Sequence, residues 1–228
     1  MVYNFFASVL FLFFSLNTSA PKKATATVAK VETLSETEVV YNNIKSHSGN
    51  MPGMDCFSMA FKGYNKLKAL GKIKKDLLTV VDFSKSSNTK RLWIIDMATN
   101  TVVYNTLVAH GRNSGDEFAT SFSNANSSNK SSLGFYATGE IYVGKHGRSL
   151  KLDGLEGANS NARSRGVVMH AADYVSENFI KQHNRLGRSQ GCPALPNNLT
   201  AEVINLIKDK SCLFIYHPTK TYKSAFAG

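Results

Sequence analysis

The spacing of hydrophobic and polar positions changes along this chain. An almost uninterrupted apolar run at residues 5–16 gives way to small and polar residues at 17–34. Residues 54–71 then carry apolar side chains three and four positions apart, which predicts an amphipathic helix. From residue 77 onward, β-branched and aromatic runs are separated by Gly, Asn and Ser, which predicts strands and turns. The pattern therefore predicts a helical segment in front of a β-rich domain.

Two helices are predicted between residues 35 and 75. Ser35 is a suitable N-cap for the first, because Glu38 follows three positions later as in a capping box. Asp55 is the candidate N-cap of the second helix, and Gly71 is a suitable stop.

The β-rich part contains a predicted hairpin, in which residues 91–96 and 101–108 flank a four-residue turn. Residues 113–132 are polar and rich in Ser and Asn, which predicts a long loop. Long ordered loops in compact domains are often functional. The expected elements after the hairpin are this loop at 113–132, a short helix at 173–184, a helix capped by Thr200 at 200–208 and a last strand at 212–217.

The apolar run at residues 5–16 is typical of a secretory signal, and small residues at 18–20 match a signal-peptidase site. We therefore expect cleavage after residue 20, with 21–34 as a linker. The alternative is an N-terminal membrane anchor, but a spanning helix needs about 20 apolar residues. The mature chain is expected to be soluble and exported, without a stable membrane span.

The composition and net charge of the chain limit the kinds of partner that it is expected to bind. Its 228 residues include 27 Lys and Arg against 16 Asp and Glu, a net charge of +11, and 43% are hydrophobic, which excludes intrinsic disorder. A basic exported protein suits an anionic surface such as a cell wall or lipid headgroups. Export and the lack of a known binding motif argue against nucleic acid. The alternative is a soluble protein whose basic surface has no specific partner.

Cys192 lies in the segment GRSQGCPALP, residues 187–196. Gly191 permits an unusual backbone conformation, and such a turn could aim the amides of Gly191 and Cys192 at a developing oxyanion. The thiolate is the nucleophilic form of cysteine, and Arg185, Arg188 and a nearby imidazole would favour it. The alternative is a structural cysteine that is buried or disulfide-bonded.

His170 ends an apolar run that predicts a strand. A histidine at a strand end can reach a cleft and act as a general base, or it can be a hydrogen-bonded histidine of the core. Cys192 follows His170 by 22 residues, with a predicted helix and loop between them. That separation allows the two side chains to lie on neighbouring elements, the pairing that nucleophilic catalysis needs.

The remaining histidines and cysteines lack the close spacing of metal ligands. We therefore expect neither a metal nor another cofactor. The residues considered are His110, His146, His183, His217, Cys56 and Cys212.

The order of strand, histidine, short helix, loop and Ser-x-Gly-Cys resembles the YkuD-like L,D-transpeptidases of bacterial cell-wall metabolism. Their motif is a His followed by [ST]-x-G-C, which Ser189-Gln190-Gly191-Cys192 fits. The resemblance is to a divergent branch and covers about residues 77–217. Its other segments are His110–Gly115, Lys130–Tyr136, Gly154–Glu156 and Gly187–Leu195.

This resemblance implies a mainly β, mixed β-sandwich with a few helices as the catalytic domain at 77–217, between the helical segment 35–75 and a C-terminal tail at 218–228. It implies Cys192 as nucleophile and His170 as base, oriented by a backbone carbonyl rather than by Asp173. The residues implied around this pair are Gly191 and Ser189 in the oxyanion loop, with Arg188 and Tyr174 as substrate-binding candidates.

The implied reaction is attack of Cys192 on a peptidoglycan tetrapeptide stem, with release of D-alanine and formation of a thioester. An amine of a second stem, or water, would resolve it. The alternatives are an L,D-carboxypeptidase that uses water and a non-catalytic wall-binding protein on the same fold. The expected location is the periplasm or cell envelope of a bacterium, or outside the cell.

The chain departs from the family pattern near the motif. Gln190 stands where many members have His, and Ala171 replaces the Gly that usually follows the catalytic His. Pro193 and Ala194 replace a hydrophobic residue and an Arg, so the role of that Arg cannot be transferred. If Cys192 stays free to react, Cys56 and Cys212 are left as a disulfide hypothesis.

Overall fold

The computed structural model describes Met1 and residues 34–227. The expected signal segment and almost all of the linker at 21–34 lie outside the described residues. No helix among the described residues combines the length and apolar surface needed to cross a membrane.

The helical segment contains α1 (Glu36–Asn43) and α2 (Met54–Ala69). The predicted capping box is confirmed, because the Ser35 side chain accepts from the Glu38 amide and the Glu38 carboxylate accepts from the Ser35 amide. The N-cap predicted for the second helix is wrong. Gly53 occupies that position, and Asp55 lies in the first turn, where its charge suits the positive end of the helix dipole.

The strands form one eight-stranded mixed sheet with the order β3-β2-β1-β8-β4-β5-β6-β7. The pairs β1–β8 and β6–β7 are parallel and the others are antiparallel. A bridge joins Ala109, just beyond β3, to Ala194 of β7, so the two edges of the sheet meet. This confirms the mainly β, mixed fold. The strands are β1 (Leu77–Asp82), β2 (Leu92–Asp96), β3 (Thr101–Thr106), β4 (Gly134–Gly144), β5 (Gly147–Gly154), β6 (Val168–Ala171), β7 (Ala194–Leu195) and β8 (Cys212–Tyr216).

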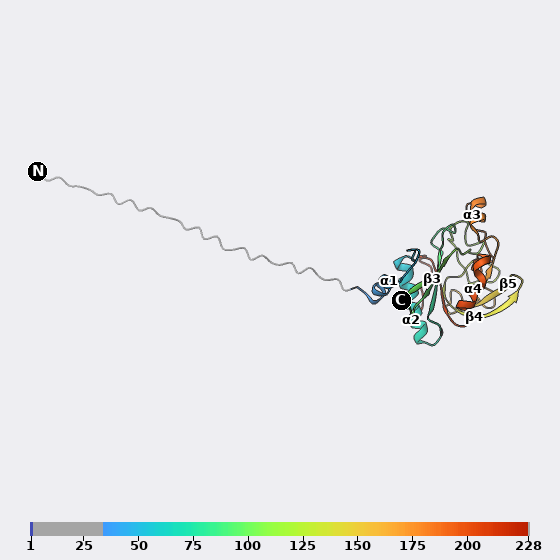
Figure 1. The fold of residues 1–228 in the computed structure, drawn as a ribbon, viewed down its shortest axis with the longest axis horizontal. Coiled ribbons are helices and arrows are strands. Elements are labelled where there is room, and N and C mark those ends of the chain that lie inside the picture. Colours follow the sequence, from blue (N-terminus) through green and yellow to red (C-terminus); the bar gives the residue numbers. More distant parts are fainter. Residues whose placement is uncertain (2–33, 228) are drawn as a thin grey trace. The chain divides into compact units, whose positions relative to one another are not determined.

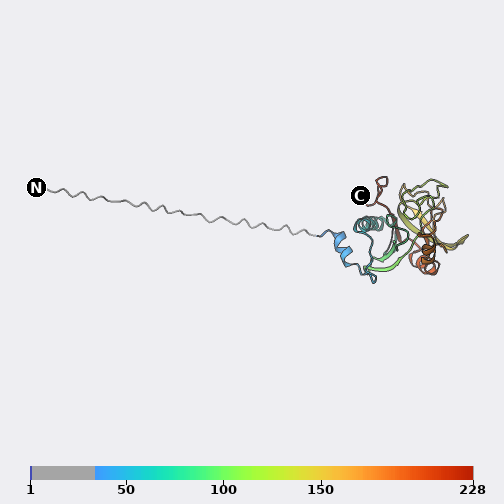
Figure 2. The same cartoon turned by 90° about the horizontal axis from the view of Figure 1, so that it is seen from above.

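Strand alternation divides the core into two layers. Leu78 and Val80 of β1 pack against α2, whereas Val81 packs in the second layer with Val203 and Ile207 of α4 (Asn197–Ile207). Figures 1 and 2 show α1 and α2 on one side of the strands and α4 on the other. The helical segment and the β-rich region thus form one compact unit across the described residues 34–227.

The short helix α3 (Glu177–His183) lies inside its predicted range, but α4 begins earlier than expected. Pro196 is its N-cap, so the prediction that Thr200 caps this helix is wrong. The buried Thr200 hydroxyl instead donates to the Pro196 carbonyl at 2.8 Å. Pro196 has the backbone angle that a helix entry needs, and the chain turns directly from β7 into α4.

The disulfide hypothesis is also wrong. Cys56 of α2 and Cys212 of β8 are both free thiols, buried in the core layer under α2. Burial raises the pKa of both thiols well above the usual range, which keeps them protonated and unreactive.

The C-terminal tail is held by Glu156, which belongs to the Gly154–Glu156 segment of the family resemblance. Its buried carboxylate accepts hydrogen bonds from the Phe135 amide (2.8 Å), the Tyr222 hydroxyl (2.6 Å) and the Ala225 amide (2.7 Å). Glu156 therefore ties the start of β4 to the tail and lies outside the cavity described below.

Candidate active site

His170 is in β6, and Cys192 is in the turn that leads into the neighbouring parallel strand β7. His170 in β6 lies opposite Ala194 in β7, and Cys192 is in the turn two residues before Ala194. This register places Cys192 beside Val168, whose amide donates to the Sγ atom at 3.4 Å. Since side chains two positions apart in a strand point to the same face, His170 and Val168 share one side of β6. Both His170 and the half-buried Cys192 line the same cavity of about 690 Å³.

Ser189 shapes the turn that carries the thiol. Its hydroxyl donates to the Cys192 carbonyl at 2.6 Å and accepts from the Gly191 amide at 3.0 Å. Gly191 has φ +124°, and an added Cβ would lie 2.7 Å from the Lys130 carbonyl oxygen. A side chain at this position would therefore push the turn away from the loop that contains Lys130.

The amides of Gly191 and Cys192, which are expected to hold an oxyanion, differ in their hydrogen bonding. The Gly191 amide is already bonded to the Ser189 hydroxyl. The Cys192 amide has no hydrogen-bond acceptor within residues 34–227, so it is the amide that is free to receive an oxyanion.

His170 is oriented by the backbone. Its Nδ1 lies 2.8 Å from the Ala171 carbonyl oxygen, which can only accept, so Nδ1 carries the proton and Nε2 keeps a lone pair. Asp173 instead accepts a hydrogen bond from Asn197. Burial lowers the pKa of His170, and the nearby His146 lowers it further. The imidazole is therefore neutral at neutral pH and can accept a proton.

The surroundings of Cys192 do not stabilise its thiolate, contrary to the expectation from the sequence. Burial raises the pKa of Cys192, and this outweighs the opposite effects of the Val168 amide and Arg165. The cavity therefore holds a neutral thiol and a neutral imidazole, and within residues 34–227 no hydrogen bond joins Cys192 Sγ to His170, since the sulfur contacts Val168 and Gly166 instead. A thiol that attacked from this state would have to lose its proton in the same step.

The two arginines expected to favour the thiolate bind other groups. Arg185 donates to the Leu186 carbonyl at 2.9 Å, and Arg188 forms an ion pair with Asp116. Arg188 still lines the cavity, as does Tyr174, the other substrate-binding candidate. Burial raises the pKa of Tyr174 to about 12, so its hydroxyl stays protonated.

His110 contacts the turn that carries Cys192 through its backbone, and it does not line the cavity. Its backbone carbonyl accepts from the Ser189 amide at 2.9 Å. Its Nδ1 lies 2.8 Å from the Arg91 guanidinium, which can only donate, so Nε2 carries the proton and donates to Gly115. Burial and the Arg91 charge lower the pKa of His110 to about 4. This histidine is a neutral structural link.

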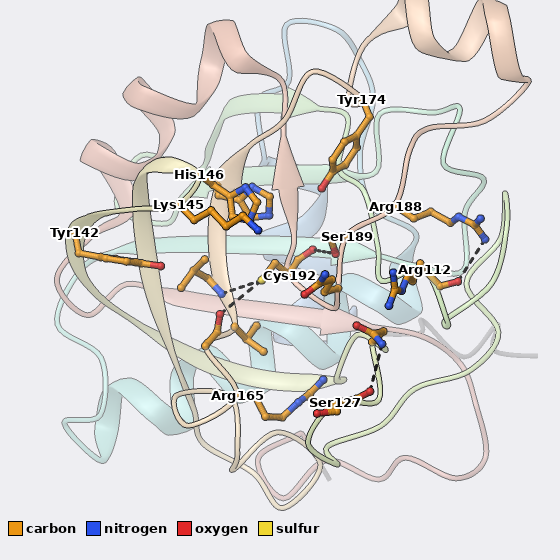
Figure 3. A pocket seen from close by; sticks show the side chains of 16 residues that line it. Arg112, Ser127, Tyr142, Lys145, His146, Arg165, Tyr174, Arg188, Ser189 and Cys192 are labelled. Atoms are coloured by element: carbon orange, nitrogen blue, oxygen red, sulfur yellow. Dashed lines mark hydrogen bonds between the residues drawn. The ribbon is translucent and has the colours of Figure 1, made fainter.

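A second imidazole in the site was not predicted from the sequence. His146, at the tip of the β4–β5 hairpin, stacks on His170 with ring centroids 4.4 Å apart and an interplanar angle of 22°. Figure 3 shows His146 with Lys145 on one side of Cys192, and Arg112 with Arg188 on the other. Nothing in the sequence near His146 indicates this contact, because the hairpin must fold before the two rings meet.

Arg165 is a further residue that the sequence did not indicate as part of the site. Its guanidinium donates to the Ser123 carbonyl (3.0 Å), the Ser132 hydroxyl (2.6 Å), the Ser128 hydroxyl (3.1 Å) and the Lys130 carbonyl (2.8 Å). These bonds fix the long polar loop at 113–132 as one wall of the cavity. In the sequence, Arg165 is noticeable only because it stands five positions before His170, and this position does not indicate its bonds to the loop.

Arg165→Gln is expected to destabilise the fold by roughly 2–3 kcal/mol, because half-buried acceptors lose a charged, multidentate donor. Urea denaturation measures the change, and limited proteolysis should show cleavage within residues 113–132. Arg163→Gln is the control, since Arg163 forms exposed ion pairs with Glu140 and Asp153 and should change stability by less than about 1 kcal/mol. Equal stability of both variants would contradict the role given to Arg165.

A sequence model of the L,D-transpeptidase catalytic domain matches residues 49–216, well over half of the chain. The chain belongs to this family. The match begins before α2 and therefore includes that helix with the sheet. Within residues 34–227, no three His, Cys, Asp or Glu side chains of the domain converge as metal ligands.

Several solved structures are similar to the L,D-transpeptidase domain at low identity. An L,D-transpeptidase from Mycobacterium smegmatis is 11% identical, with 62% of this chain and 59% of that chain covered and a TM-score of 0.40. The helical cell shape determining protein Pgp2 from Campylobacter jejuni is 16% identical, with coverage of 72% and 57% and a TM-score of 0.40. An L,D-transpeptidase from Xylanimonas cellulosilytica is 10% identical, with coverage of 78% and 89% and a TM-score of 0.37.

The chain spans less than two thirds of the length of the first two of these structures. Comparison with curated proteins found no match.

Proposed function

We propose that the protein is an exported cysteine acyltransferase that crosslinks peptidoglycan stem peptides by L,D-transpeptidation. One observation carries the proposal: His170 in β6 and Cys192 in the turn that leads into the paired strand β7 line one cavity of an L,D-transpeptidase catalytic domain. A wall-binding protein without activity would have no need for a half-buried thiol and an imidazole in one cavity. Export through residues 1–20 and a place in the bacterial envelope are part of the proposal.

The first half of the reaction transfers an acyl group to sulfur. The thiol proton moves to His170 Nε2 as Cys192 Sγ bonds to the carbonyl carbon between the L-centre and the terminal D-alanine. The Cys192 amide donates to the oxyanion. The C–N bond then breaks as its nitrogen takes the proton from His170, so D-alanine leaves and a thioester remains.

The second half restores the enzyme. An amine of a second stem attacks the thioester carbonyl, and its proton passes through His170 to the departing Sγ. A new amide crosslink forms and the thiol is regenerated. If water takes the place of the amine, the product is a shortened tripeptide stem and the enzyme is an L,D-carboxypeptidase.

The purified chain, mixed with tetrapeptide muropeptides, is expected to release D-alanine and form crosslinked dimers, which liquid chromatography with mass spectrometry resolves. A carbapenem should add covalently at Cys192, as peptide mapping would locate. Tripeptide stems without dimers would identify the carboxypeptidase. If neither D-alanine nor an adduct appears, the proposal is wrong.

A further inference from the structure

Arg91 is a buried cation that takes no direct part in the proposed reaction. It stands just before β2, its side chain is fully buried, and within the described residues no carboxylate forms a salt bridge with it. Burial lowers the pKa of Arg91 to about 9, so the guanidinium keeps its charge at neutral pH. The Phe83 ring lies against it, with its centroid 4.8 Å from the Cζ atom. A charge removed from water without a carboxylate partner is costly unless its donors are satisfied.

The donors of Arg91 are satisfied mainly by one short segment, residues 108–111 after β3. Nε and Nη2 donate to the Val108 carbonyl at 3.2 and 3.0 Å, and Nη2 donates to His110 Nδ1 at 2.8 Å. Nη1 donates to the Lys85 carbonyl at 2.8 Å, which joins the segment to the turn after β1. The planar guanidinium, with donors fixed in a fork, can make these bonds at the same time.

Arg91 binds this segment at the point where regular strand pairing stops. The β2–β3 ladder ends at the pair Leu92–Thr106. Arg91 stands one residue before Leu92, so its side chain continues the connection beyond the last strand pair. On its other side the segment meets β7 through an isolated bridge rather than a ladder. The guanidinium therefore supplies hydrogen bonds that strand pairing does not.

The same segment supports the turn at 189–194, which carries Cys192. Backbone hydrogen bonds join the segment to the turn on both sides of the thiol. They run from the Ser189 amide to the His110 carbonyl (2.9 Å), from the Ala109 amide to the Ala194 carbonyl (2.9 Å) and from the Ala194 amide to the Ala109 carbonyl (3.4 Å). The two backbones are also in close contact, since a Cβ added to Gly111 would lie 2.9 Å from Gly191 Cα. A shift of residues 108–111 would therefore move the turn.

We propose that Arg91 is a positioning residue for the Cys192 nucleophile. Its guanidinium fixes residues 108–111 where the sheet closes, and these residues fix the turn that places Cys192 in the cavity. Arg91 does not line the cavity, so its effect on the reaction passes through the backbone. The inference rests on the proposed function, because it adds a residue to the machinery of that reaction.

The first test compares Arg91→Lys with Arg91→Met in the D-alanine release assay. Lysine keeps the charge but donates from one nitrogen, whereas methionine has neither the charge nor a donor. Both variants should lower kcat by roughly 10- to 100-fold and change KM by less than about threefold, because a displaced nucleophile slows the chemical step. Thermal unfolding shows whether each variant is folded. If Arg91→Met does not fold, Arg91→Lys and the variants below decide the test.

Two variants of His110 test its side-chain bond while Arg91 stays in place. In His110→Asn the side-chain oxygen can take the position of Nδ1 and accept from Arg91. In His110→Gln the longer amide reaches the position of Nε2, which donates to the Gly115 carbonyl at 3.2 Å, and Arg91 loses an acceptor. His110→Asn should therefore have a kcat about fivefold higher than His110→Gln, the effect of one hydrogen bond. Equal kcat values would exclude the link through His110.

Thr138→Val is the matched control. The buried Thr138 hydroxyl donates to the Ile207 carbonyl at the end of α4, so this variant also loses a buried hydrogen bond. Neither residue contacts the turn at 189–194 through a hydrogen bond within residues 34–227. Thr138→Val should therefore lower the unfolding temperature and leave kcat unchanged.

Hydrogen exchange measured by mass spectrometry follows the turn without any substrate. The Ser189 and Ala194 amides donate to residues 108–111, so both should exchange about tenfold faster in Arg91→Lys than in the wild type. In Thr138→Val these two amides should exchange at the wild-type rate.

The results separate this inference from the proposed function. If the wild type releases no D-alanine, the proposed function fails, and the exchange rates decide whether Arg91 positions the turn. If the wild type is active and both Arg91 variants match its kcat, Arg91 is not a positioning residue. The inference is also wrong if exchange at Ser189 and Ala194 does not change, or if Thr138→Val lowers kcat as much as Arg91→Lys.

Discussion

Cys192→Ala is expected to abolish D-alanine release, with a loss of roughly 10³-fold or more in kcat/KM, because no other nucleophile is positioned in its place. Cys192 is half-buried, and among residues 34–227 its Sγ makes two weak hydrogen bonds, with the Val168 amide at 3.4 Å and the Gly166 carbonyl at 3.7 Å. Removing the sulfur should therefore leave the fold intact. Assays of D-alanine release and thermal unfolding measure the two effects separately.

Cys56→Ala is the matched control for this prediction. Cys56 is a buried free thiol in the core layer under α2. Its replacement should cost about 1 kcal/mol of stability and leave kcat unchanged. Cys192→Ala with wild-type turnover, or Cys56→Ala without turnover in a folded protein, would contradict the assignment of Cys192 as nucleophile.

His170→Asn is expected to lower kcat/KM by roughly 10²–10⁴-fold, the usual contribution of a general base. The asparagine amide can still donate to the Ala171 carbonyl, which His170 Nδ1 contacts at 2.8 Å, but it cannot take the thiol proton. His146→Asn is the control, because it removes the stacked ring and keeps the base. A His170→Asn variant as active as His146→Asn would exclude His170 as the base.

The pH dependence follows from the same two groups. Burial lowers the pKa of His170, so the acid limb of kcat/KM should lie below about pH 6.5, the ordinary histidine value. Burial raises the pKa of Cys192, so iodoacetamide should react slowly at neutral pH and faster only at alkaline pH. In His146→Asn the acid limb should move to higher pH, because His146 lowers the pKa of His170.

A pH-rate series of alkylation tests the resting state directly. Rapid alkylation at pH 5–6 would show a preformed thiolate–imidazolium pair. That result would overturn the neutral pair inferred from burial and leave the roles of both residues in place.

Local features were predictable from the sequence because their causes lie within a few residues. The capping box at Ser35 needs only Glu38, and the β2–β3 hairpin needs only its turn and two alternating runs. The family resemblance added Cys192 and His170 as candidate site residues, since the motif and the strand that contains His170 are each contiguous in the sequence. The start of α4 was missed, because Thr200 is a common capping residue and the contribution of Pro196 depends on where β7 ends.

From the sequence alone followed a mainly β domain, its family and the two residues that we propose as a nucleophile–base pair. Only the tertiary structure decided that Cys56 and Cys212 stay apart as buried thiols, that Arg165 fixes one wall and that His146 stacks on His170. It also decided that Cys192 rests as a neutral thiol. The physical reason is that burial, stacking and charge pairing depend on groups far apart in the chain, which only the closed sheet brings together.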